Sequence, residues 1–205
     1  MSTSGRAQGR RFDRDHSVAT QAVLFLADLD PDAVGDAGAH ATHYEPVPVA
    51  DFQALLRTVP DEVIHSSTFV DVGAGMGRAL LLASEYPFKQ AVGIEVSPGL
   101  YEVGRHNIAN ARGFQSRCHD VRLVLADARL WSYPSGDLVV FLYNPFDGEA
   151  LAATLASIAG RESAGDTWLV YHTPVERELI EANPYWTIHA EVRDAVVYRS
   201  NGKVY

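Results

Sequence analysis

The chain has 205 residues, of which 47% are hydrophobic and 21% are charged, and its formal net charge is −9. This composition is typical of one soluble globular domain, and the negative charge argues against non-specific binding to nucleic acid or to an anionic membrane. The single cysteine, Cys118, excludes an intramolecular disulfide and a cysteine-based zinc cluster, and no apolar run is long enough to span a bilayer. We therefore expect a cytoplasmic protein.

The N-terminal third has little strand character. Residues 1–15 are rich in Gly, Ser, Arg and Gln, which predicts a flexible tail. Residues 31–48 are rich in Gly, Ala, Asp and Pro and are typical of a loop, whereas residues 49–59 place apolar side chains at helical spacing up to Pro60. We assign residues 16–66 to an N-terminal lid or helical extension and residues 67–205 to the main domain.

From Thr68 onward, short apolar runs alternate with helical stretches. Strands are expected at 68–72, 91–96, 121–126, 137–143 and 167–172, helices at 78–86, 98–111, 149–159 and 174–183, and an antiparallel hairpin within 185–205. This order predicts an α/β fold, a Rossmann-like three-layer sandwich with a mostly parallel seven-stranded sheet that ends in the hairpin. Such a sheet binds ligands at the carboxyl ends of its strands.

Three glycines, Gly73, Gly75 and Gly77, follow the first of these strands in the stretch "FVDVGAGMGR". Their spacing differs from the G-x-G-x-x-G dinucleotide fingerprint, and no Lys-Ser/Thr pair follows as in a phosphate-binding P-loop. Asp71 precedes them, and a carboxylate there would repel a pyrophosphate but attract a cationic ligand. A tight strand-to-helix turn with no ligand is the alternative interpretation.

The pattern resembles the first motif of class I S-adenosylmethionine-dependent methyltransferases, whose cofactor carries an ammonium and a sulfonium. The resemblance covers residues 68–199, with four motifs in order at strand ends and a reversed seventh strand, and it implies that residues 67–205 form a class I methyltransferase domain. It implies that Glu95 holds the ribose hydroxyls and that Asp127 lies near the adenine amino group. Either acid alone could equally be a solvated loop residue. The residues that this resemblance and the next assign to the cofactor are Tyr44, Glu45, Asp71, Gly73, Ala74, Gly75, Gly77, Glu95, Val96, Asp127, Ala128 and Asn144.

A second resemblance covers the N-terminal part. Residues 12–20, 43–56 and 69–88 look like a widespread group of small, largely uncharacterised bacterial methyltransferases. The "YEP" element, Tyr44–Pro46, is also similar to the Y-x-P-T/S stretch of lysine methyltransferases of the Dot1 type, which folds over the cofactor, although Val47 stands where the hydroxyl residue would be. The resemblance implies a lid over the cofactor. The alternative is that Tyr44 is a surface aromatic residue that anchors a loop.

The stretch "YNPF", residues 143–146, resembles the N/D-P-P-Y/F/W motif of amino methyltransferases with one proline in place of two. It implies that Asn144 accepts hydrogen bonds from a target amine, that Pro145 and Phe146 contact the acceptor, and that His172 takes a proton. The alternatives are a strand-end turn set by Asn-Pro and a structural hydrogen bond for His172. The missing proline and the net charge favour an amine of a small molecule or of a protein over nucleic acid.

The sequence therefore predicts S-adenosylmethionine-dependent methyl transfer to an unidentified acceptor. The reaction needs no metal, and the chain shows no convincing metal-ligand cluster. A non-catalytic module that binds S-adenosylmethionine or a nucleotide is one alternative, because a fold and a cofactor motif do not establish turnover. A nicotinamide-dependent reductase is another, which Asp71 and the glycine spacing disfavour.

Overall fold

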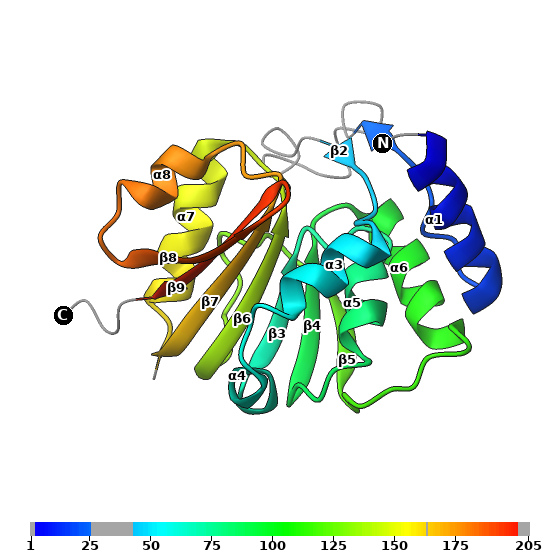
Figure 1. Cartoon of the computed structure of the whole chain (residues 1–205), viewed down its shortest axis with the longest axis horizontal. Helices are drawn as coiled ribbons and strands as arrows, with labels where there is room; N and C mark the ends of the chain where they lie inside the picture. The colour runs from blue at the N-terminus through cyan, green and yellow to red at the C-terminus, as the bar shows by residue number, and fades with distance from the viewer. Residues whose placement is uncertain (1–2, 26–42, 163, 201–205) are drawn as a thin grey trace.

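A seven-stranded sheet forms the centre of the molecule in the computed structural model, which describes residues 3–25, 43–162 and 164–200 (Figure 1). The strand order is β5-β4-β3-β6-β7-β9-β8. The first five strands in this order are parallel, and β9 runs antiparallel to both β7 and β8. The strands are β3 (Thr68–Val72), β4 (Gln90–Glu95), β5 (Val121–Leu125), β6 (Gly136–Tyr143), β7 (Ala164–His172), β8 (Trp186–Val192) and β9 (Ala195–Ser200). The predicted Rossmann-like architecture with its C-terminal hairpin is confirmed.

Helices cover both faces of this sheet, because the parallel strands carry apolar side chains on both sides. One face packs against α3 (Val49–Leu56), α4 (Asp61–Ser66), α5 (Arg78–Ala83) and α6 (Pro98–Asn110), and the other against α7 (Gly148–Ala159) and α8 (Arg177–Glu181). Alternate residues of β6 enter the two cores: Val139 and Phe141 face the first set of helices, and Val140 and Leu142 face the second. Helix α8 begins at Arg177, three residues after the proline at which its start was predicted.

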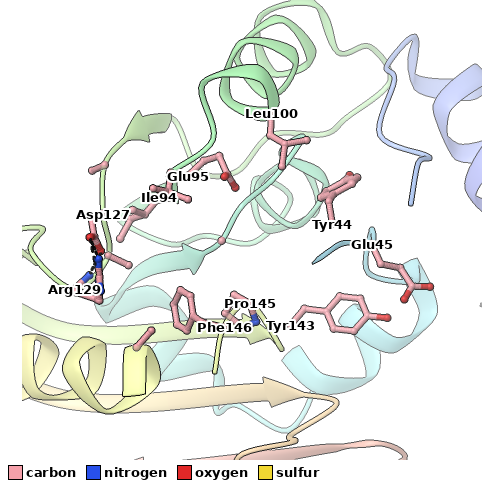
Figure 2. A pocket seen from close by; sticks show the side chains of 15 residues that line it. Tyr44, Glu45, Ile94, Glu95, Leu100, Asp127, Arg129, Tyr143, Pro145 and Phe146 are labelled. Atoms are coloured by element: carbon pink, nitrogen blue, oxygen red, sulfur yellow. Dashed lines mark hydrogen bonds and ion pairs between the residues drawn. The ribbon is translucent and has the colours of Figure 1, made fainter. Parts of the chain in front are cut away.

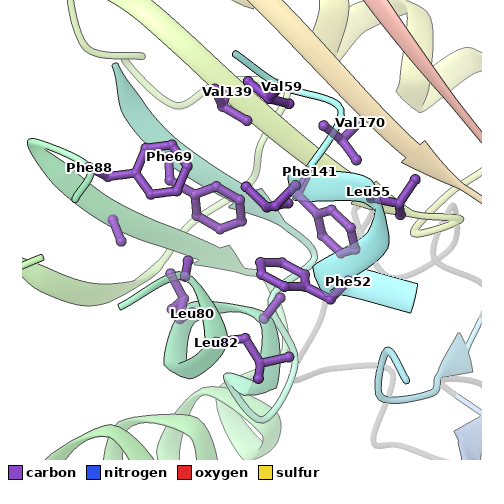
Figure 3. Packing of buried hydrophobic residues seen from close by; sticks show 14 of the residues in the cluster. Phe52, Leu55, Val59, Phe69, Leu80, Leu82, Phe88, Val139, Phe141 and Val170 are labelled. Atoms are coloured by element: carbon purple, nitrogen blue, oxygen red, sulfur yellow. The ribbon is translucent and has the colours of Figure 1, made fainter. Parts of the chain in front are cut away.

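An aromatic cluster fixes α3 against the sheet (Figure 3). The ring of Phe52 on α3 makes edge contacts with Phe69 of β3 and Phe141 of β6, at centroid distances of 5.9 and 5.3 Å. All three side chains are at most 1% exposed, and burying each contributes about 1.5–3 kcal/mol. This packing holds the chain that enters α3, residues 44–48, near the carboxyl ends of the central strands.

The prediction of a flexible tail is wrong for residues 3–15, the part of it that the structure describes. Residues Thr3–His16 form helix α1, which lies beside α6 (Figure 1). Phe12 is 7% exposed, its ring contacts Phe114, and the guanidinium of Arg78 lies 4.8 Å from its centroid. The sequence pattern hid these contacts because the partners lie far along the chain.

Two short strands follow α1 in the chain. β1 (Leu24–Phe25) pairs antiparallel with β2 (His43–Tyr44). The predicted loop at 31–48 falls largely on residues 26–42, which lie outside the described residues. Within the part of the chain that the structure describes, no helix is both long and apolar enough to cross a membrane.

Candidate functional site

A cavity with about 700 Å³ of space, including its open mouth, lies at the carboxyl ends of β3, β4, β5 and β6 (Figure 2). This is the edge at which the sequence predicts a ligand site. The cavity is lined by Tyr44, Glu45, Gly73, Ile94, Glu95, Val96, Leu100, Ala126, Asp127, Ala128, Arg129, Tyr143, Pro145, Phe146 and Ala150. Nine of the predicted site residues are in this wall.

The glycine turn after β3 has left-handed backbone at all three glycines and no room for a side chain at Gly73 and Gly75. Gly73, Gly75 and Gly77 all have positive φ, at 76°, 54° and 85°, a region that costs other residues about 1–2 kcal/mol. A Cβ on Gly73 would lie 2.7 Å from Cβ of Pro145, and one on Gly75 would lie 2.2 Å from ring carbons of Tyr44. Glycine is therefore required here by close approach as well as by backbone conformation.

Glu95, at the end of β4, is 4% exposed and forms part of the cavity wall. Its Oε2 accepts a hydrogen bond from the Gly75 N–H at 2.7 Å, and its Oε1 accepts one from the Ser97 N–H at 2.8 Å. Burial raises the pKa of Glu95, while these backbone donors oppose that rise. The carboxylate thus ties the glycine turn to the start of α6, and it faces the cavity as an acceptor for a ligand hydroxyl.

Asp71 lies in β3, just before the turn, and is 3% exposed. Burial, with the charge of Glu95 as a second cause, raises its pKa to about 8. Asp71 lines a smaller adjoining cavity together with Tyr44, Glu45, Arg78 and Ala74, among others. A cation bound beside Asp71 would favour its ionised form.

Asp127, after β5, forms a two-pronged ion pair with Arg129. Nε of Arg129 lies 3.0 Å from both carboxylate oxygens, and its Nη2 lies 2.7 Å from Oδ2. Both side chains line the cavity, although the sequence predicted only Asp127 and Ala128 there. The Asp127 charge that was expected to meet the adenine amino group is therefore balanced by a guanidinium.

Tyr44 is 7% exposed and lies over Gly75. Its hydroxyl donates a hydrogen bond to the Thr20 carbonyl at 2.7 Å, and burial raises its pKa, which keeps the hydroxyl protonated. Thr20 in turn donates through its hydroxyl to Asp13 at 2.6 Å and accepts from Arg78 at 2.7 Å. The alternative interpretation of Tyr44 as a surface aromatic residue is wrong, because the ring is part of the cavity wall.

Tyr143 ends β6 and lines both cavities, a position the sequence analysis did not single out. Its hydroxyl and the carboxylate of Glu45 point toward one another (Figure 2). Burial raises the pKa of Tyr143. The negative charge of Glu45, and the hydrogen bond between Glu45 and the Tyr143 hydroxyl, raise this pKa further. Glu45 and Tyr143 therefore form a polar pair at this end of the cavity.

Asn144 is not in the wall of either described cavity, although Pro145 and Phe146 beside it line the larger one. Its φ is 43°, in the left-handed region, and its Oδ1 accepts a long hydrogen bond of 3.5 Å from the hydroxyl of Tyr171. Asn144 thus lies in the chain between two cavity-lining residues, Tyr143 and Pro145, while its side chain contacts Tyr171.

His172 is also absent from both cavity walls and is 7% exposed. Its Nδ1 lies 2.9 Å from the Thr173 hydroxyl, its Nε2 lies 3.7 Å from Asp51, and its ring packs edge-on against Tyr143 at 4.4 Å. Burial lowers the pKa of His172, although Asp51 opposes this, so the ring tends toward its neutral form. His172 therefore contacts the cavity residue Tyr143 without itself lining either cavity.

The cavity residues that sequence reasoning missed have recognisable positions. Ile94, Ala126 and Tyr143 each precede a predicted residue at a strand end, and Leu100 and Ala150 lie in the first turn of the helix that follows a strand. Searching one residue to either side of each strand end, and the first turn of each following helix, would have found them. Arg129 gave no comparable signal beyond its nearness to Asp127.

Comparison with known proteins places the fold. No protein-family model and no curated protein matches the sequence. Among solved structures, yhhF of Escherichia coli, a protein assigned as a methyltransferase, has a TM-score of 0.55 and 19% identity over 73% of this chain and 84% of that one. The PH0226 protein of Pyrococcus horikoshii has a TM-score of 0.54 and 15% identity over 75% and 89%.

A third similar structure was solved with a ligand. Magnesium protoporphyrin IX methyltransferase of Synechocystis, with bound S-adenosylmethionine, has a TM-score of 0.51 and 11% identity over 74% of this chain and 78% of that one. At identities this low, the similarity shows a shared fold. The chain therefore has the Rossmann-like fold of class I methyltransferases.

Proposed function

We propose that this protein is an S-adenosylmethionine-dependent methyltransferase and that its acceptor is an amine of a small molecule or of a protein. The observation that carries the proposal is the convergence of the glycine turn, Glu95 and Asp127 on one cavity at the carboxyl ends of β3, β4 and β5. The fold supports it, because the similar structures include methyltransferases.

The residues present fit this cofactor. Gly73 and Gly75 let the backbone approach a ligand closely, and Glu95 offers a carboxylate to ribose hydroxyls. Asp71, buried beside the turn, suits the cationic end of the molecule. Apolar side chains such as Ile94 and Leu100 suit the faces of an adenine ring near Asp127. When bound, S-adenosylmethionine supplies a methyl group on a positively charged sulfur.

The chain's own contribution is to align the acceptor and to exclude water. Tyr44, Pro145 and Phe146 surround the cavity with bulky groups, which limits access of water to the reacting atoms. An in-line displacement needs a correctly oriented lone pair and no metal.

Two measurements test the proposal. Calorimetry should show binding of S-adenosylmethionine and S-adenosylhomocysteine and not of NAD(H). The variant Glu95→Ala should bind at least about tenfold more weakly, since a hydrogen bond to a charged group contributes about 1.5–3 kcal/mol. Glu102→Ala is the matched control, because Glu102 is an exposed acid on α6 outside the cavity.

Labelled-methyl transfer to small-molecule and protein extracts, followed by mass spectrometry, should then identify the acceptor. Binding without transfer to any acceptor would favour the non-catalytic binding module. Binding of NAD(H) in preference to S-adenosylmethionine would contradict the cofactor assignment itself.

A further inference from the structure

The cavity has two polar ends separated by apolar side chains (Figure 2). At one end lie Asp127 and Arg129, joined by their ion pair. At the other end lie Glu45 and Tyr143, which come from the segment before α3 and from the end of β6. Phe146 and Pro145 lie between the two ends in the same view.

The order of strand ends along the cavity sets which end faces the acceptor. In the proposed function, Asp127 faces the adenine and Glu95 the ribose, so the remainder of the cofactor points toward Gly73 and the end of β6. Glu45 and Tyr143 lie at that end and also line the adjoining cavity that contains Asp71. They are therefore polar side chains at the end of the cavity where, in the proposed function, the methyl group would be transferred.

The other polar side chains in the wall are engaged in holding the structure together. Glu95 accepts from two backbone N–H groups, the Tyr44 hydroxyl donates to Thr20, and Asp127 is bound by Arg129. Glu45 is hydrogen-bonded to the Tyr143 hydroxyl, a group that can itself donate to or accept from a substrate.

The surroundings of this pair are negative. Three carboxylates, those of Glu45, Asp51 and Asp194, act on the Tyr143 hydroxyl, and the same three act on His172 behind it. Asp51 also forms an ion pair with Arg193, so one of these three negative charges is partly balanced. Aromatic rings of Tyr143, Tyr44 and Phe146 line the same space. Carboxylates together with aromatic faces favour a cation over an anion.

We propose that Glu45 and Tyr143 hold the acceptor nitrogen as an alkylammonium and that Glu45 is the base that takes its proton. This inference rests on the proposed function and assigns Glu45 to the acceptor rather than to the cofactor. The nitrogen transfers one proton to the Glu45 carboxylate, and the freed lone pair forms the new bond to the methyl carbon as the carbon–sulfur bond breaks. The products are the methylated ammonium, which carries the positive charge that the sulfonium has lost, and S-adenosylhomocysteine, and the proton leaves Glu45 to solvent. The Tyr143 hydroxyl orients the nitrogen.

The assignment replaces the acceptor role that the sequence gave to Asn144 and His172. Pro145 and Phe146 keep their place beside the acceptor because they line the cavity. Asn144 contacts Tyr171, and His172 packs edge-on against the Tyr143 ring, so this inference gives both residues a supporting place beside the acceptor site.

The test uses the full chain, labelled S-adenosylmethionine and two pools of acceptors. One pool contains primary and secondary alkylamines and lysine-containing peptides, and the other contains the matching alcohols and carboxylic acids. The label should enter the amine pool, on nitrogen by mass spectrometry. Glu45→Gln should lower the transfer rate by about a hundredfold, as expected for loss of a general base, with Glu45→Asp recovering part of it. Tyr143→Phe should lower the transfer rate by a smaller factor than Glu45→Gln does.

Controls separate this inference from the proposed function. Glu162→Gln, at an exposed acid outside both cavities, should transfer at the wild-type rate. Glu45→Gln should keep its calorimetric affinity for S-adenosylmethionine within about twofold, whereas failure of the wild type to bind that cofactor would overturn the proposed function. Label on oxygen or carbon, no transfer to amines by a protein that binds the cofactor, or a wild-type rate in Glu45→Gln would overturn the inference alone.

Discussion

The ring of Tyr44 lies directly on Gly75, so closely that a Cβ on the glycine would fall 2.2 Å from two ring carbons. The contact joins the segment before α3 to the turn after β3, two parts of the chain that the sequence analysis treated as a lid and a cofactor loop. In this structure the lid residue is already in place over the turn. Changes at either residue should therefore affect both the stability of the fold and the binding of a ligand.

The first prediction concerns Gly75→Ala. The added methyl meets the Tyr44 ring, and alanine at a φ of 54° costs about 1–2 kcal/mol more. We expect a lower melting temperature and at least about tenfold weaker binding of S-adenosylmethionine, measured by thermal denaturation and calorimetry. Gly99→Ala is the control, since its nearest neighbour atom would be 3.9 Å away and its φ is not positive. Equal binding by the two variants would contradict a role for the Gly75 contact.

The second prediction concerns the Tyr44 hydroxyl. Tyr44→Phe keeps the ring over Gly75 but removes the hydrogen bond to Thr20, so we expect a loss of about 1 kcal/mol in the free energy of unfolding and little change in ligand affinity. Tyr44→Ala also removes the ring and should weaken ligand binding clearly. Urea denaturation and calorimetry on both variants would separate the two effects. If the two variants bound the ligand with similar affinity, the Tyr44 ring would not contribute to the ligand site.

The third prediction concerns the buried ion pair between Arg78 and Asp13. Arg78 is 3% exposed, and its Nη2 lies 3.1 Å from Oδ1 of Asp13 on α1. Asp13→Ala leaves the guanidinium uncompensated, and removing one partner of a buried pair costs about 3–5 kcal/mol. Denaturant titration should show this loss. The double variant Asp13→Ala, Arg78→Met should be more stable than Asp13→Ala alone, and an additive result would argue against the pairing.

The fourth prediction concerns pH. Burial raises the pKa of Asp71 from 3.8 to about 8, so the folded protein holds a proton there that the unfolded chain has lost. The resulting stabilisation is complete below about pH 4 and is lost as the pH rises toward 8. Asp71→Asn should therefore be less sensitive to pH over this window and more stable than the wild type above pH 8. Denaturation at pH 5.5 and pH 8.5 checks both expectations, with Glu95 contributing in the same direction in each protein.

The fifth prediction separates the two assignments of the acceptor residue. Because Asn144 lies outside both described cavity walls, Asn144→Gly should transfer methyl groups within about threefold of the wild-type rate. Glycine is the suitable replacement because it tolerates the φ of 43°. A loss of tenfold or more with unchanged cofactor affinity would restore the amine-clamp interpretation of "YNPF".

The sequence predicted the sheet well because local patterns determine it. Residues 68–72 were assigned as a strand and form β3 with the same bounds, and the continuous burial of the centre of β6 corresponds to a clear apolar run in the sequence. The positions of Glu95 and Asp127 at or just after strand ends followed from the predicted strand bounds, and the resemblance to class I methyltransferases singled these two acids out. These features depend on hydrophobic periodicity and on glycine, which can be recognised without knowing the fold.

The remainder could not be predicted because it depends on contacts between distant residues. Helix α1 is held by Phe12 and Asp13, whose partners include Arg78. The direction of the Asn144 side chain depends on a left-handed φ that an Asn-Pro pair does not announce. The pairing of Glu45 with Tyr143 requires α3 to be fixed on the sheet first.

The ion pair between Arg78 and Asp13 also bears on the order in which the protein folds. The two residues are 65 positions apart, so α1 leaves the ribosome long before its main polar partner exists. A 14-residue helix that contains two glycines is marginal alone in water, and we expect it to form only once the sheet has assembled. Because Thr20, and through it Tyr44, are held by the same network, the wall of the cavity closes in the same late step. A nascent chain that has been synthesised through the glycine turn, but not yet through α5, would therefore still lack the contacts that hold Tyr44 in the cavity wall.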